Sequence, residues 1–353
     1  MICGGVGTKM WPLSRQKFPK HFLPLIKGRS LFQVNYEILL KKFKPKEIYI
    51  QTTPDQIKTA LKQAPGVPFR NCFVEPELRN HGPAMGFMAL KLSLIDPDEP
   101  FFLVQVDDLR QPGDKFIRMM EQSEILVKER AKLVTGGIRP DYLIMGVDYL
   151  LAEKRIKDMG RLKVFQMKKW LDRDTHRDLI LKYFKQKSLL AHANHYCWTP
   201  RLLLAAYRRW APDWYLALEK IKAAFGRPNE GKIIKEEYSK MEKAQVEKVT
   251  RHELEEGYVV ELPFEWIDIG TWESLARFYQ DRGITSPNDD FLQIDSNNYF
   301  VYQTKGKFVA TIGVKDLVII DAKDGLLICD KRQTGRVGEV VEYLKRKQKN
   351  NYL

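Results

Sequence analysis

The stretch that organises this chain is Cys3-Gly4-Gly5-Val6-Gly7-Thr8-Lys9-Met10-Trp11-Pro12-Leu13-Ser14-Arg15, followed by Pro19-Lys20-His21-Phe22-Leu23. Its three glycines let the backbone approach a ligand closely, and successive N–H groups in such a turn form an anion-binding nest. Thr8, Lys9, Arg15 and Lys20 add a hydroxyl and positive charge nearby. The stretch therefore indicates a loop that wraps a nucleoside triphosphate. The alternative is a glycine-rich turn with scattered surface cations. It is neither a P-loop nor a GxGxxG dinucleotide fingerprint.

A second chemical signal is the apolar run Phe101–Val106 that ends in Asp107 and Asp108. Such a run predicts a buried strand with a carboxylate at its carboxyl end, where open α/β sheets bind ligands. A carboxylate there can hold Mg²⁺ while phosphate oxygens fill other positions. Asp107 is the predicted ligand. Asp108 either strengthens metal binding or faces solvent.

Short apolar strands alternate with helical patterns through the first half of the chain. Strands are predicted at 47–52, 71–75 and 259–264, and helices at 30–43, 54–64, 83–92 and 114–130. This alternation is typical of a parallel α/β sheet. After Pro287 the sequence changes to short β runs with turns, and a basic helix is predicted over 335–349. We therefore expect two domains, residues 1–286 and 287–353.

The composition is that of a globular protein, with 353 residues, 44% hydrophobic and 29% charged. The net charge of +14 is spread along the chain without an arginine-rich arm, which favours small phosphorylated ligands over nucleic acid. Four distant cysteines without CxxC spacing indicate reduced thiols in a cytoplasmic protein. No apolar run reaches the roughly 20 residues of a membrane span. Because only Met1 and Ile2 precede Cys3, we expect further strand residues upstream of Met1.

The segment GGVGTKMWPLSRQKFPKHFLPL closely resembles the signature of sugar-phosphate nucleotidyltransferases, GGxGTRLxPL…PK. Its Trp-Pro-Leu-Ser-Arg and Pro-Lys-His-Phe elements most resemble the mannose-1-phosphate guanylyltransferases. The resemblance implies a Rossmann-like nucleotidyltransferase domain with a mixed, mostly parallel sheet. It also implies a small C-terminal left-handed β-helix-like domain. Lys9 stands where the family has Arg, which keeps the charge but loses the bidentate fork.

Two further segments carry the resemblance into the nucleotide and metal sites. Residues 75–84 resemble EPxxRNTxPA, which lies against the nucleobase, so Glu75, Asn80 and Gly82 are expected to contact nucleotide. The Trp266–Glu273 segment resembles WSDVGSW, which implies that Asp268 is the second Mg²⁺ ligand opposite Asp107.

The sugar side departs from the family motifs. Three candidate sugar-binding residues remain, namely Gly146, Lys168 and Asn194. The glutamate of the VEKP motif has become Met167, and the glycine of the WNSG motif has become Tyr196. Loss of a hydroxyl acceptor weakens discrimination for that hydroxyl. An altered sugar pocket, or an inactive relative that retains nucleotide, is therefore expected.

The reaction that the resemblance implies is attack of a sugar 1-phosphate, with mannose first, on the α-phosphorus of GTP, forming a GDP-sugar and pyrophosphate. Lys9, Arg15 and Lys20 are the predicted catalytic cations, and the nucleotide loop is made by Gly4, Gly5, Gly7 and Thr8. Mg²⁺ is the expected cofactor, neither nucleic acid nor membrane is an expected partner, and a homodimer is allowed. The alternatives are a non-catalytic nucleotide or GDP-sugar binder, or an enzyme for another sugar 1-phosphate or nucleotide.

Overall fold

The computed structural model describes residues 1–353 apart from 6, 145, 160–161, 288–289 and 304–306. Its helices are α1 Leu31–Leu39, α2 Ile57–Gln63, α3 His81–Ser93, α4 Gly113–Arg130, α5 Arg177–Lys185, α6 Pro200–Trp210, α7 Pro212–Ala224, α8 Glu230–Lys240, α9 Glu247–Leu254, α10 Trp272–Gln280 and α11 Val337–Arg346. Its strands are β1 Ile50–Thr52, β2 Cys72–Val74, β3 Phe101–Phe102, β4 Asp108–Gln111, β5 Val134–Ile138, β6 Tyr149–Met159, β7 Leu162–Leu171, β8 Leu189–His192, β9 Cys197–Trp198, β10 Tyr258–Glu261, β11 Glu265–Asp268, β12 Phe291–Ile294, β13 Phe300–Gln303, β14 Val309–Ile312, β15 Leu317–Asp321 and β16 Leu326–Asp330.

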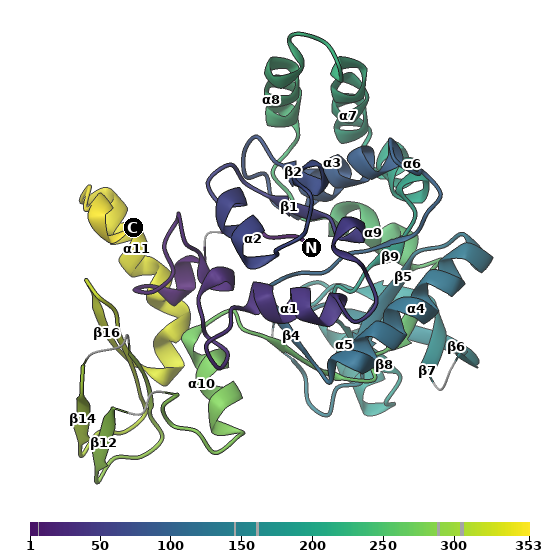
Figure 1. Cartoon of the computed structure of the whole chain (residues 1–353). Coiled ribbons are helices and arrows are strands. Elements are labelled where there is room, and N and C mark those ends of the chain that lie inside the picture. Colours follow the sequence, from purple (N-terminus) through teal and green to yellow (C-terminus); the bar gives the residue numbers. More distant parts are fainter. Residues whose placement is uncertain (6, 145, 160–161, 288–289, 304–306) are drawn as a thin grey trace.

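Helices surround a central seven-stranded sheet with the order β10-β7-β6-β8-β5-β9-β3 (Figure 1). Strands β5 and β10 pair in parallel, whereas β3–β9, β5–β8, β6–β7, β6–β8 and β7–β10 pair antiparallel. The mixed sheet is therefore confirmed, but the expectation of mostly parallel pairing is corrected for this sheet. The reason is that β6 and β7 form a long hairpin, and consecutive strands joined by a short turn pair antiparallel.

Parallel pairing prevails where the glycine-rich segment enters the fold. Ile2 makes parallel bridges to both Gln51 and Gln105, and β1 pairs in parallel with β2. Parallel strands end at the same edge, so the glycine loop, Asp107 and Glu75 all emerge on one side. The predicted strand over 101–106 is interrupted, because Leu103 donates to Tyr196 O and β4 begins separately at Asp108.

Local sequence explains the observed helix ends. Ser30 caps α1 by accepting from Gln33 N, and the Gln33 side chain returns a bond to Ser30 N, completing a capping box. The helix was expected to reach Phe43 but ends at Leu39, because Lys41 and Lys42 donate to carbonyls three residues back. No helix in the described part of the chain is long and apolar enough to cross a membrane.

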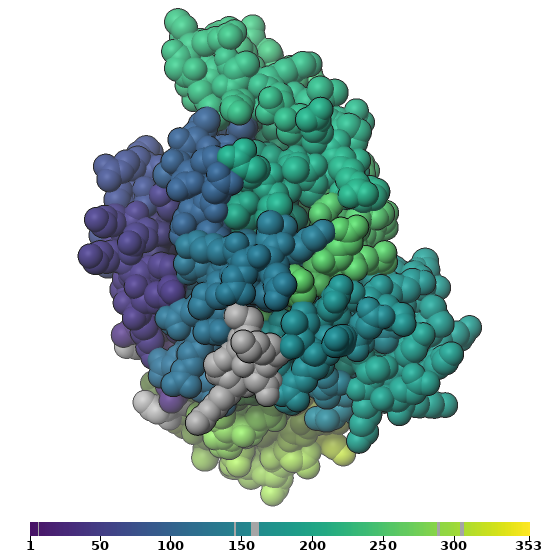
Figure 2. Space-filling model, turned by 90° about the vertical axis from the view of Figure 1, so that its right-hand side faces the viewer, coloured from purple at the N-terminus to yellow at the C-terminus, as the bar shows by residue number. Residues whose placement is uncertain are grey.

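The C-terminal domain is a small β-helix-type structure at the opposite end of the molecule from α7 and α8 (Figures 1 and 2). Strand β12 pairs in parallel with β14, β13 pairs in parallel with β15, and β16 returns antiparallel to β15. One apolar cluster joins this domain to the glycine-rich segment, and it includes Met10, Trp11, Trp272 and Phe300. The Trp272 indole donates to Trp11 O at 2.8 Å. The two domains therefore share a core.

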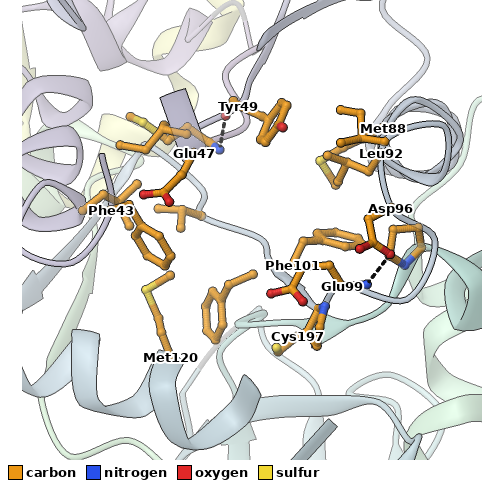
Figure 3. A pocket seen from close by; sticks show the side chains of 18 of the residues that line it. Phe43, Glu47, Tyr49, Met88, Leu92, Asp96, Glu99, Phe101, Met120 and Cys197 are labelled. Carbon is orange, nitrogen blue, oxygen red and sulfur yellow. Dashed lines mark hydrogen bonds between the residues drawn. The ribbon is translucent and has the colours of Figure 1, made fainter. Parts of the chain in front are cut away.

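A cavity of 390 Å³ lies at the other edge of the parallel strands, where they begin (Figure 3). Phe43, Tyr49, Met88 and Phe101 line it, and Met1 stands at its end. The triphosphate loop and the carboxylates come after these strands, so this cavity is separate from the candidate site.

Candidate active site

The glycine-rich segment forms a tight loop whose conformation requires glycine at position 7. Gly7 has φ +59°, and a Cβ there would lie 3.0 Å from Lys20 N and would overlap Ser14 Oγ. Thr8–Met10 continue as one 3₁₀ turn in which Lys9 is exposed. A Cβ at Gly5 would meet no atom within 4 Å. The loop therefore presents an open face at Gly5 and Lys9 and packs tightly behind at Gly7.

Lys20, Asp107 and Asp268 come together from three distant segments. Lys20 Nζ lies 3.0 Å from Asp107 Oδ2 and donates to Ile269 O, also at 3.0 Å. Ile269 N donates to Asp107 O at 3.4 Å. Strands β4 and β11 place Asp268 opposite Asp108 in register. The structure thus brings two predicted carboxylates and one predicted cation into a single cluster, beside the glycine loop.

Charge compensation decides the protonation of this cluster. Burial acts to lower the pKa of Lys20, but the carboxylates of Asp107 and Asp268 prevail and raise it above its ordinary value. Burial likewise acts to raise the pKa of Asp107, yet the ammonium of Lys20 lowers it to about 2. Both Lys20 and Asp107 are therefore charged at neutral pH.

Asp108 follows neither of the two alternatives left open by the sequence. Its side chain is buried rather than facing solvent, and Oδ2 lies 3.1 Å from Arg110 Nη2. It points into the protein on the opposite side of the strand from Asp107, since successive side chains alternate. Asp107 is therefore left as the carboxylate of this pair that faces the site.

The donor set at Asp107 and Asp268 fits Mg²⁺. Mg²⁺ favours oxygen ligands and is usually held by one or two carboxylates together with substrate phosphates. Among the described residues no group of three or more His, Cys, Asp or Glu side chains is arranged to hold a metal ion. A protein-enclosed metal cage is thus not seen there, whereas two carboxylates completed by phosphate oxygens match the residues present.

The predicted nucleobase segment lies beside the glycine loop at the start of α3. Glu75 is buried, with Oε2 accepting from Tyr238 OH at 2.7 Å and Oε1 3.6 Å from a Cβ position on Gly4. Burial raises the pKa of Glu75. Asn80 has φ +70°, and its Oδ1 accepts from His81 N, which caps α3. The segment therefore turns the amino end of α3 toward the loop, an arrangement that suits anionic ligands.

Gly82 has a different role from the one predicted. Its N–H donates to Ala244 O at 3.0 Å, and its carbonyl accepts from Tyr207 OH at 2.5 Å. A Cβ would overlap the Trp214 ring. Both backbone groups of Gly82 serve the packing of α3, so we correct the expectation that Gly82 contacts nucleotide.

Arg15 is not brought to the cluster. Its Nη2 lies 2.6 Å from Asp324 Oδ1, Nη1 donates to Tyr352 O, and the guanidinium lies over the Trp11 ring. Asp324 and Tyr352 belong to the C-terminal part of the chain. This guanidinium joins the two domains, which favours a structural role for Arg15 over the predicted catalytic one.

The sugar-side predictions separate in the structure. Asn194 has φ +50°, and its Oδ1 accepts from Tyr196 OH at 3.4 Å. Gly146 is exposed with φ +80°, and its carbonyl accepts from Arg173. Lys168 points to solvent from β7 and lies 3.7 Å from Glu153, whereas its neighbour Met167 is buried. Lys168 and Lys169 are both exposed where the register between β6 and β7 shifts, so Lys168 lies on the solvent face, and its contact with sugar stays a prediction.

Met167 and Tyr196 fill the place of the lost polar residues with apolar surface. Both belong to the largest buried cluster, and each is at most 2% exposed. Tyr196 OH also contacts Thr250 Oγ1 at 3.3 Å. The neighbouring cavity of 610 Å³ is lined by charged side chains that include Asp148, Lys248 and Arg251. At these two positions the predicted sugar side is thus occupied by buried side chains of the core.

Two contacts at the site could not be read from single residues. The Tyr238 hydroxyl donates a hydrogen bond to Glu75. The sequence feature that could have pointed to Tyr238 is its place in the run Glu237–Ala244, which resembles a family motif. The carbonyl of Ile269 receives Lys20, and a backbone acceptor leaves no mark in side-chain identity.

Comparisons with known proteins agree with this architecture. Residues 1–141 match the nucleotidyl transferase family model, and residues 289–344 match the model of the mannose-phosphate isomerase/GMP-like β-helix domain. The chain is 26% identical to a mannose-1-phosphate guanylyltransferase of Salmonella muenchen, over 100% of this chain and 74% of that protein. It is 27% identical to one from Escherichia coli strain K12, over 98% of this chain and 73% of that protein.

Solved structures show the same fold. A crystal structure titled mannose-1-phosphate geranyltransferase from Thermus thermophilus is 25% identical, with a TM-score of 0.83 over 98% of both chains. A mannose-6-phosphate isomerase from Helicobacter pylori shares the fold at 16% identity, with a TM-score of 0.58 over 71% of this chain and 96% of that chain. The glycine loop, the full-length similarity and the β-helix-type domain agree: the chain carries a nucleotidyl transferase segment over residues 1–141, and its similarity to the mannose-1-phosphate guanylyltransferases over the whole chain supports a nucleotidyltransferase enzyme.

Proposed function

We propose that the protein transfers the guanylyl group of GTP to a sugar 1-phosphate, with mannose 1-phosphate as first candidate, and releases pyrophosphate. The observation that carries the proposal is the Lys20 ammonium, 3.0 Å from Asp107 Oδ2, directly behind the glycine loop. Relatives named mannose-1-phosphate guanylyltransferase over the whole chain support the choice of GTP and mannose 1-phosphate.

The loop and its cations divide the phosphates between them. Backbone N–H groups at Gly4, Gly5 and Thr8, with the exposed ammonium of Lys9, bind the β- and γ-phosphates. Lys20 contacts the α-phosphate and the phosphate of the attacking sugar, and so holds the nucleophile next to its target. Phosphoryl-group transfer depends mainly on such positioning and charge neutralisation.

Asp107 and Asp268 would hold Mg²⁺, which when bound offsets the negative charge of the phosphate oxygens. The pairing of Lys20 with Asp107 keeps both groups charged before substrate arrives. When phosphates enter, the ammonium of Lys20 can turn toward them while the carboxylate remains ionised. Lys20 and Asp107 therefore need no proton transfer to reach the reactive arrangement.

The buried Met167 and Tyr196 favour a second candidate, an enzyme of the same reaction type with a different sugar 1-phosphate. A polar pocket that loses a hydroxyl acceptor loses discrimination for that hydroxyl. A panel of sugar 1-phosphates separates the two candidates.

The test is pyrophosphate release from GTP and mannose 1-phosphate with Mg²⁺, repeated with other sugar 1-phosphates and nucleoside triphosphates. Asp107→Asn is expected to lower turnover at least 100-fold, because it removes the charge that holds the metal and pairs with Lys20. Asp114→Asn is the matched control, since Asp114 pairs with Lys41 on the surface. Absence of pyrophosphate across the whole panel would refute the proposed function, and full turnover by Asp107→Asn would refute the metal assignment.

A further inference from the structure

The short segment that carries Asp107 is held from its inner side by hydrogen bonds to its carbonyl groups. Arg110 Nη1 donates to Gln105 O at 3.1 Å and to Asp108 O at 3.3 Å. Asn35 Nδ2, from α1, donates to Val106 O at 3.3 Å and to Asp108 O at 2.9 Å. The carbonyls on both sides of Asp107 are thus fixed by two side chains.

Arg110 is itself held in one orientation. Its side chain is 1% exposed, Nη2 lies 3.1 Å from Asp108 Oδ2, and Nη1 donates to Asn35 Oδ1 at 2.7 Å. The guanidinium also lies over the Phe116 ring at 4.8 Å. A buried guanidinium is tolerated where its charge is paired and its donors are bonded, and removal of one partner costs several kcal/mol. The rigid fork of arginine suits this position better than a lysine ammonium does.

His195 connects Arg110 to the segment of Asn194, which is a predicted sugar-binding residue. Arg110 Nε donates to His195 Nε2 at 2.8 Å, which leaves the ring proton on Nδ1, and Nδ1 donates to Ala193 O at 2.5 Å. His195 is fully buried and stands next to Asn194 in sequence. The guanidinium therefore links the segment that carries Asp107 with the segment that carries Asn194.

We propose that Arg110 is a positioning residue that holds Asp107 toward Asp268 and, through His195, sets the segment of Asn194 relative to the metal ligands. The inference rests on the proposed function, in which Asp107 and Asp268 hold a divalent cation. Arg110 touches neither substrate nor metal and acts through the backbone on either side of Asp107.

The experiment titrates Arg110→Lys and wild type with Mn²⁺ alone and measures the bound Mn²⁺ by electron paramagnetic resonance. Loss of an outer partner of a metal ligand typically weakens metal binding 10–100-fold, and we expect at least a 10-fold weaker Mn²⁺ affinity. Arg139→Lys is the matched control, because Arg139 makes a comparable fork to Glu261 at 2.9 and 3.1 Å away from the cluster. Its Mn²⁺ affinity is expected to equal that of wild type.

A second readout follows steady-state turnover. We expect Arg110→Lys to raise the KM for the sugar 1-phosphate as well as the Mg²⁺ concentration for half-maximal rate, because both segments lose their common support. If Arg110→Lys does not fold, Asp108→Asn combined with Arg110→Met removes the buried pair together, and the same loss of Mn²⁺ affinity is expected.

The outcomes separate cleanly. A folded Arg110→Lys with the Mn²⁺ affinity of wild type overturns the inference, as does a wild type that binds no Mn²⁺. A wild type that binds Mn²⁺ but releases no pyrophosphate with any substrate overturns the proposed function, while the Mn²⁺ comparison still decides on Arg110.

Discussion

Replacement of Gly7 by alanine tests the conformation of the glycine loop. Gly7 has φ +59°, where an L-residue costs about 1–2 kcal/mol. The new methyl group would overlap Ser14 Oγ and lie 3.0 Å from Lys20 N, and overpacking of this kind costs about 1–3 kcal/mol. Reduced freedom of the unfolded chain returns about 0.4–1 kcal/mol. The net loss of unfolding free energy is therefore about 1–5 kcal/mol.

Gly5→Ala is the matched substitution in the same loop. Gly5 does not have a positive φ, and a methyl group there would meet no atom within 4 Å. We expect its stability to stay within about 1 kcal/mol of wild type. Its GTP affinity should fall at least 10-fold, because the methyl group stands on the open face where phosphate is expected.

The stability of the two variants is compared by urea unfolding with tryptophan fluorescence as the readout. Their GTP affinity is measured by isothermal titration calorimetry. The expected pattern is a stability loss in Gly7→Ala and an affinity loss without stability loss in Gly5→Ala. Equal stability of the two variants would refute the reasoning from φ and packing. Wild-type GTP affinity in Gly5→Ala would refute the assignment of the loop face to phosphate.

Three further predictions concern single residues. Arg15→Ala should speed tryptic release of the C-terminal domain while GTP turnover stays within a few-fold, and Asp324→Ala should do the same; a 100-fold loss of turnover in Arg15→Ala alone would return Arg15 to the catalytic group. Burial lowers the pKa of His192 to about 3, so its stability contribution is complete above the unfolded pKa of about 6.5 and declines as pH falls. Between pH 7 and pH 5 the free energy of unfolding should therefore fall by about 2 kcal/mol less in His192→Gln than in wild type, as measured by urea unfolding. An equal fall in both proteins would contradict this. Lys20→Met should reduce pyrophosphate release at least 100-fold and also lower the melting temperature, because it leaves the carboxylates of Asp107 and Asp268 without their ammonium partner, whereas turnover at the wild-type rate would exclude Lys20 from the reaction.

The local chemistry of the chain was open to prediction where it depends on short-range patterns. The glycines and Lys20 were predicted from the opening motif, Asp107 from its place at the end of an apolar run, and Asp268 from the resemblance of its segment to a family motif. The partners of Arg15 and Lys168 could not be predicted, because the direction of a long side chain depends on segments far away in sequence. Asp324 is 309 residues from Arg15, and Lys168 faces solvent beside the register shift between β6 and β7.

The burial of Asp108 illustrates the same limit. Two adjacent aspartates after an apolar run look equivalent in sequence, yet one faces the site and the other pairs with Arg110. The surrounding groups decide which carboxylate is neutralised inside the protein. Arg110 of β4 pairs with Asp108, and Asn35 of α1 and His195 accept hydrogen bonds from the same guanidinium.

The amino-acid sequence by itself determined the glycine loop and the class of ligand that it suits, because conformational freedom and charge belong to the residues themselves. The tertiary structure alone decided which charges meet. It placed Lys20 against Asp107, turned Arg15 to the C-terminal domain, and filled the sugar side with Met167 and Tyr196. Such pairings depend on distances between segments that lie far apart in the sequence, and no local pattern encodes them.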